Sequence, residues 1–102
     1  MKAVRIMNGT YNVTLVTPFG PKKGTVVFTD RNGVLNGSIH AMGDTSNFRN
    51  GKADGNTFKF SGVFNAGFFN VQYTAKGAIE GNALKGTVNT NLGTFEMYGV
   101  KA

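Results

Sequence analysis

The sequence predicts an all-β protein, an antiparallel up-and-down meander of about eight strands that closes into a small barrel. Three observations predict this fold. Short β-rich runs alternate with turn residues roughly every 8–12 positions. No segment keeps a helical period. No connection is long enough for a parallel crossover, which takes about a dozen residues. Closing the meander would remove the exposed edges of the sheet.

The first four runs lie at residues 9–17, 25–29, 35–41 and about 47–52. In the first run, Tyr11, Val13 and Leu15 share one face, and polar residues occupy the other, as in a half-buried strand. Proline and glycine at residues 18–21 end this run, and the Asn-Gly turn at residues 32–33 joins the second run to the third. The fourth run is weak because only Phe48 in it is clearly apolar.

The last four runs lie at residues 58–64, 69–75, 84–89 and 94–99. Turn residues separate them at 53–56, 65–67, 80–82 and 91–93. Alternation places Leu84 and Val88 on the inner face of the seventh run, and Phe95 and Met97 on the inner face of the eighth. Tyr98 falls on the outer face.

Composition limits the protein to one domain and excludes several classes. We expect an N-terminal extension at residues 1–8 and a single β-barrel domain at residues 9–102. With 40% hydrophobic and 16% charged residues, the chain is not of the disordered class. No cysteine is present, which excludes a disulfide framework and a thiolate metal site. The first residues lack the apolar region of a secretory signal, so we expect a cytoplasmic protein with no membrane segment.

Four glycines fall at inward strand positions: Gly37, Gly62, Gly86 and Gly99. Glycine in a strand weakens it, so its presence calls for a reason. Either these positions allow the strands to bend sharply, or they leave interior volume for a ligand. An eight-stranded barrel is wide enough to be filled by its own side chains or to hold one small ligand. The sequence leaves both interpretations open.

Three stretches resemble a known family. Residues 8–15, residues 24–28 and the turn leading into residues 35–37 are similar to the opening of small bacterial calycin-like barrels. They are similar in particular to the lipocalin-like family that includes the negative regulator of type III secretion loci. The resemblance implies a compact, often dimeric barrel that binds or regulates and is not an enzyme. The family's regulator contact is associated with an acidic surface segment, and this chain has no acidic run. It also has no tryptophan, so biotin or retinoid binding is not implied.

A binding module for a small apolar ligand, or for a regulatory partner protein, is therefore the expected function. Seven large inward-facing residues are the candidate ligand-binding pocket: Tyr11, Phe28, Phe60, Phe64, Tyr73, Phe95 and Met97. We expect no catalytic residues, no cofactor and no metal site. His40 is the only histidine and lies on the polar face, where it is a solvated surface residue or, alternatively, a general base or a polar pocket anchor. Four of the five carboxylates fall in turns.

A basic β-surface that binds single-stranded nucleic acid is the alternative. The formal net charge is +6, and three lysines are expected on the outer face. These are Lys59, Lys76 and Lys85, together with Asn70, Gln72 and Thr87. The arginines, at positions 5, 31 and 49, are scattered and form no cluster.

Two further expectations concern contacts between molecules. Phe19 and Phe68 fall at turns, where each either forms an exposed contact patch or caps the barrel end. The weak fourth strand would leave a sheet edge to cover, which predicts a homodimer.

Overall fold

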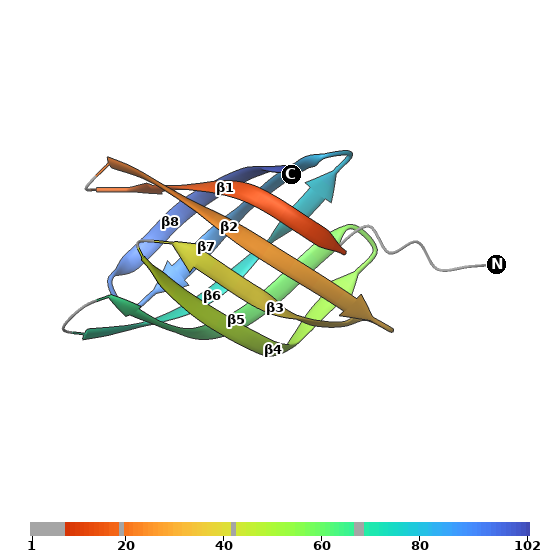
Figure 1. Cartoon of the computed structure of the whole chain (residues 1–102), viewed down its shortest axis with the longest axis horizontal. Coiled ribbons are helices and arrows are strands. Elements are labelled where there is room, and N and C mark those ends of the chain that lie inside the picture. Colours follow the sequence, from red (N-terminus) through yellow and green to blue (C-terminus); the bar gives the residue numbers. More distant parts are fainter. Residues whose placement is uncertain (1–7, 19, 42, 67–68) are drawn as a thin grey trace.

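A closed antiparallel barrel of eight strands in chain order is the fold of the computed structural model (Figure 1), as predicted. The structure describes residues 8–18, 20–41, 43–66 and 69–102. Phe19, Phe68 and residues 1–7 of the expected extension lie outside the described residues. The strands are β1 (Gly9–Thr17), β2 (Gly20–Arg31), β3 (Val34–Ala41), β4 (Asp44–Asp54), β5 (Thr57–Ala66), β6 (Phe69–Glu80), β7 (Ala83–Thr90) and β8 (Gly93–Lys101).

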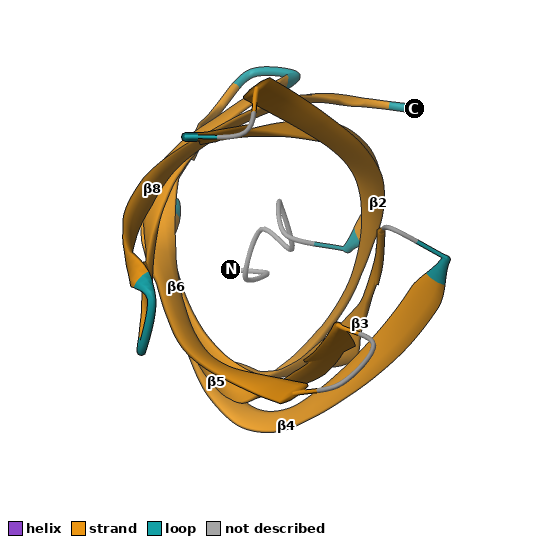
Figure 2. Cartoon of the chain, turned by 90° about the vertical axis from the view of Figure 1, so that its left-hand side faces the viewer, coloured by secondary structure: helices purple, strands orange, loops and turns teal. Residues whose placement is uncertain are grey.

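Pairing of β8 with β1 closes the ring, which Figure 2 shows along the barrel. We call the end that carries the β1–β2, β3–β4, β5–β6 and β7–β8 connections the upper end; it lies at the left in Figure 1. The opposite end is the lower end. Because each strand is paired on both sides, the described barrel has no edge strand. The pairing of β4 with β5 is short, however, and covers only Lys52–Asp54 and Thr57–Lys59. Dimerisation stays a prediction.

Alternation of inward and outward side chains follows the prediction along most strands. On β1, Tyr11 and Val13 are buried, whereas Asn12 between them is exposed. On β8, Met97 is buried, whereas Tyr98 is exposed. The period-two pattern therefore identifies the core correctly.

Three strands exceed their predicted lengths the most. β2 begins at Gly20 and includes Pro21, which a strand tolerates near its first residue because no earlier ladder bond is lost. β6 continues to Glu80, because Gly77 and Ile79 extend its inner face beyond residue 75. β4 runs from Asp44 to Asp54, beyond the predicted residues 47–52 on both sides.

β4 lacks an apolar alternation because small residues occupy its inner face. Ser46 and Gly51 are buried there together with Phe48. An irregularity in the β3–β4 register lies between Leu35 and Gly37. On β4, Asn50 has a φ of 59°, and its backbone N–H is held by the side chain of a β3 asparagine. This geometry is that of a β-bulge, in which one extra residue displaces the pattern.

The inward glycines are sites of close approach. A Cβ atom on Gly37 would lie 1.8 Å from the Val27 carbonyl oxygen and 2.9 Å from a ring carbon of Phe48. One on Gly62 would lie 2.6 Å from the Tyr73 hydroxyl oxygen. At Gly86 and Gly99 the nearest atoms would be at 2.4 and 2.7 Å. Neighbouring atoms therefore fill the space that these glycines leave, and the interpretation that they create a pocket is wrong.

Candidate functional site at the upper end of the barrel

The lower part of the interior is filled with aromatic rings. The Phe48 and Phe60 rings stack with centroids 4.0 Å apart, and Phe28 lies 5.4 Å from Phe58 and 5.7 Å from Tyr11. Tyr11 has an accessible area of 0% and Phe60 of 1%. A side chain without accessible area touches neither solvent nor a void that admits water. The aromatic rings therefore bury one another in this half of the barrel, as in an ordinary core.

The upper end has a different lining. Leu15 of β1 and Val71 of β6 are only partly buried and pack against the core from this side. Phe64 lies opposite Val71 in the β5–β6 register, and Phe95 lies opposite Val88 in the β7–β8 register. Phe95 is half-buried. Phe64 and Val88 in this apolar wall are buried, and solvent reaches the wall at Leu15, Val71 and Phe95. Apolar walls of this kind are typical of small-molecule sites.

The seven predicted pocket residues thus divide between the two parts of the barrel. Phe64, Tyr73 and Phe95 lie toward the upper end. The other four are fully buried in the packed interior: Tyr11, Phe28, Phe60 and Met97. Their assignment to a ligand pocket stays a prediction. In the first group Phe64 and Tyr73 are buried, and solvent reaches Phe95.

A buried hydrogen-bonded pair lies among the upper-end residues. The Ser46 hydroxyl donates to the Val63 carbonyl oxygen at 2.7 Å, and the Ser46 and Tyr73 hydroxyl oxygens are 3.0 Å apart. Because the single Ser46 proton is used by the carbonyl, Tyr73 donates to Ser46. The Tyr73 oxygen then keeps acceptor capacity for a further partner.

Burial also controls the ionisation of this pair. Desolvation raises the pKa of Tyr73 above its ordinary value of 10.0, because the phenolate would lose its hydration. The hydrogen bond with Ser46 offsets part of this rise, since the Ser46 proton can turn toward a phenolate. Tyr73 is therefore a neutral phenol at physiological pH.

Ser46 was not among the predicted site residues. It is the buried polar residue of the described barrel, at 5% exposure, and it lies where the β4–β5 register is short. That register covers only Lys52–Asp54 with Thr57–Lys59, whereas β5 pairs with β6 along its whole length. Beyond the Lys52–Lys59 pair, the hydrogen bond from the Ser46 hydroxyl to the Val63 carbonyl links β4 to the β5 backbone. In the sequence, its position two residues before Phe48 was the one indication that Ser46 shares the inward face of this strand.

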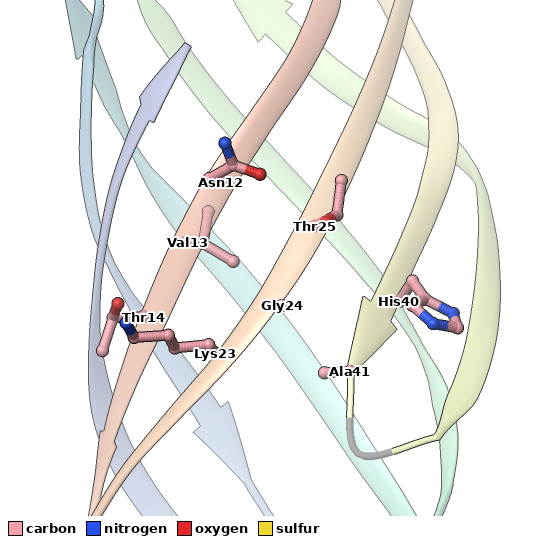
Figure 3. Close-up of a pocket in the computed structure, with 8 residues that line it drawn as sticks. All are labelled: Asn12, Val13, Thr14, Lys23, Gly24, Thr25, His40 and Ala41. Carbon is pink, nitrogen blue, oxygen red and sulfur yellow. The ribbon is translucent and has the colours of Figure 1, made fainter. Parts of the chain in front are cut away.

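A groove lies on the outer surface across β1, β2 and β3 (Figure 3). It is an open groove of about 610 Å³ with a mainly polar set of lining residues: Asn12, Val13, Thr14, Lys23, Gly24, Thr25, His40 and Ala41. His40 is exposed, and its Nδ1 atom lies 2.6 Å from the Thr45 hydroxyl oxygen. The structure thus places His40 on the outer face.

Titratable groups are not gathered into a reactive cluster in the part of the chain that the structure describes. There, no three histidine or carboxylate side chains are placed to hold a metal ion. Asp30 accepts a hydrogen bond from the backbone N–H of Gly33 at 3.1 Å, which is the turn role predicted for it. Within the same residues, no helix has the length and hydropathy to cross a bilayer.

The chain matches no protein-family model and no curated protein. Among solved structures, it is similar to a redesigned β-barrel named b11L5F_LGL, with a TM-score of 0.72 and 14% identity over 94% of this chain and 90% of that one. It is also similar to a redesigned β-barrel, mFAP1, bound to DFHBI, with a TM-score of 0.71 and 15% identity over all of both chains. Such low identities establish the fold alone. The resemblance to the lipocalin-like family stays a prediction.

Proposed function

We propose that this protein is a binding module that holds one small, mainly apolar molecule at the upper end of its barrel. The observation that carries the proposal is the contrast within the interior. The lower part is closed by stacked rings, whereas Leu15, Val71 and Phe95 at the upper end stay partly accessible. Apolar walls with a few fixed polar groups are typical of small-molecule sites. The fold neighbour mFAP1 is a barrel of this size with a small molecule, DFHBI, bound.

The polar pair indicates the chemistry of the ligand. Tyr73 donates its proton to Ser46, so its oxygen is left as an acceptor. A ligand with an O–H or N–H group at one end of an apolar body would satisfy that oxygen. In this proposal the protein binds its ligand without catalysing a reaction.

Fluorescence titration with the dye ANS, which brightens in apolar surroundings, tests the location of the site. Val71→Trp would fill the upper end, because Val71 is partly buried and packs on the core from that side. Val63→Trp is the matched control, because Val63 is 48% exposed on the outer face of the adjacent strand. We expect saturable binding to the wild type, at least about tenfold weaker binding to Val71→Trp, and no change in Val63→Trp.

Unfolding curves would show that both variants remain folded. Equal affinity of Val71→Trp and the wild type would contradict the proposed location. Absence of any ANS binding to the folded wild type would overturn the proposal, and a regulatory partner protein would become the function to test.

A further inference from the structure

A row of lysines crosses three neighbouring strands on the outer face of the barrel. Lys52 of β4 lies directly opposite Lys59 of β5, and Lys59 lies directly opposite Lys76 of β6. All three side chains are exposed. Neighbouring strands are about 4.8 Å apart, so the backbones of the three lysines follow one another across the sheet at about that spacing. Like charges directly opposite each other destabilise a sheet, and here the arrangement occurs twice in succession.

Lys85 extends this group onto β7. It is exposed and lies two residues from Thr87, which is the register partner of Lys76. We call Lys52, Lys59, Lys76 and Lys85 the lysine row. Lys59 and Lys76 were both predicted on the outer face, and the register shows in addition that they are direct neighbours.

Carboxylates lie only at the margins of the lysine row. Asp54 is two residues beyond Lys52 on β4, Glu80 stands diagonally from Lys85, and Glu96 is the register partner of Thr87. Among the described residues, none of these carboxylates has an oxygen within 4.0 Å of the side-chain nitrogen of a lysine of the row, the distance that defines an ion pair. In the part of the chain that the structure describes, no lysine of the row is therefore directly paired with a carboxylate.

Hydroxyl and amide groups border the lysine row on one side. Ser61 and Thr74 are opposite each other, with hydroxyl oxygens 2.9 Å apart, and Thr74 is opposite Asn89 on β7. The Asn89 side chain accepts a hydrogen bond from Thr94 at 2.8 Å. Such side chains, together with lysines, are the groups that contact phosphates and sugars in nucleic-acid complexes.

An exposed aromatic ring borders the lysine row on the β8 side. Tyr98 is the register partner of Lys85 and is 40% exposed. Its hydroxyl donates to a Glu96 carboxylate oxygen at 2.6 Å, which fixes the end of the ring while leaving its face available. Bases of single strands stack on such rings, whereas bases of a duplex are already stacked on one another.

We propose that the lysine row and Tyr98 form a binding surface for single-stranded nucleic acid. The lysines hold the phosphates of the backbone, and Tyr98 stacks on one unpaired base. An acidic protein segment is the less suitable occupant, because its carboxylates do not stack on the Tyr98 ring and it has no sugar groups for the hydroxyl border. This surface is separate from the upper-end ligand site, so either proposal can fail without the other.

Fluorescence anisotropy of a labelled oligothymidylate of about 12 nucleotides tests this proposal. Each phosphate held by a lysine contributes about −0.7 to the slope of log K against log salt for a single strand. Four contacts therefore predict that affinity falls about fifty-fold between 50 and 200 mM salt. The double variant Lys59→Gln with Lys76→Gln should halve that slope and weaken binding at low salt.

The matched control is Lys23→Gln with Lys101→Gln, which removes the same charge from β2 and the end of β8. We expect it to keep the wild-type salt slope. Tyr98→Leu should weaken binding by about tenfold without changing the slope, because stacking is not a charge contact.

Three results would overturn the proposal: no binding of the oligothymidylate at 50 mM salt, equal losses in the two double variants, or a polyglutamate peptide of the same charge that competes equally well. The last result would identify an acidic protein segment as the occupant. Thermal unfolding of each variant would separate lost binding from lost folding.

Discussion

Replacing Ser46 by alanine removes both hydrogen bonds that its hydroxyl makes inside the barrel. The Val63 carbonyl and the Tyr73 hydroxyl then lose their partner in a largely buried place. An unsatisfied buried polar group costs about 1–3 kcal/mol, so Ser46→Ala should lower the free energy of unfolding by about 2–4 kcal/mol. Tyr73→Phe removes only one bond and leaves Ser46 on its carbonyl, which should cost about 0.5–1.5 kcal/mol.

The double variant Ser46→Ala with Tyr73→Phe gives the coupling energy between the two hydroxyl groups, which tests the assignment most sharply. In the Ser46→Ala background, Tyr73→Phe deletes a hydroxyl that has already lost its partner, so its cost should fall to about zero. The expected coupling energy is therefore about 1 kcal/mol. Urea unfolding followed by far-UV circular dichroism measures each free energy, and Tyr98→Phe, at an exposed site, is the control. If Tyr73→Phe costs the same in both backgrounds, the assignment of the hydrogen bonds is wrong.

Three further predictions test other parts of the structure. Gly37→Ala should strongly reduce or abolish folding, measured by thermal unfolding, because its Cβ would lie 1.8 Å from the Val27 carbonyl oxygen. Lys76→Glu should raise the free energy of unfolding by about 0.2–1 kcal/mol at low salt, and by less at high salt, since it places a carboxylate opposite Lys59. The raised pKa of Tyr73 means that the unfolded chain loses its proton first, so unfolding free energy should fall as pH rises above about 10, and Tyr73→Phe should reduce that fall in an alkaline titration.

The fold could be predicted from the sequence because most strands keep a clear alternation of inward apolar and outward polar residues. Tyr11 and Val13, or Phe58 and Phe60, identify an inner face without knowledge of any partner strand. The limits of β4 could not be found in this way. Ser46 and Gly51 take inward positions that apolar residues usually occupy, and the bulge shifts the pattern between them.

The candidate site was only partly predictable for a related reason. Alternation shows that Phe60 and Phe64 point inward, but not how high each lies along the barrel axis. That height depends on strand tilt and stagger, which come from pairing between strands. Likewise, alternation places Lys59 and Lys76 on the outer face, but only the register makes them direct neighbours.

The most direct test of the proposed ligand site is a methyl NMR spectrum recorded during titration with ANS. If the upper end is the site, the methyl signals of Leu15, Val71 and Val88 should shift progressively and saturate. Those of the closed interior, from Leu35, Ile79 and Leu84, should stay in place. Shifts confined to the interior methyls or to the exposed outer valines, or no shifts at all, would contradict the account.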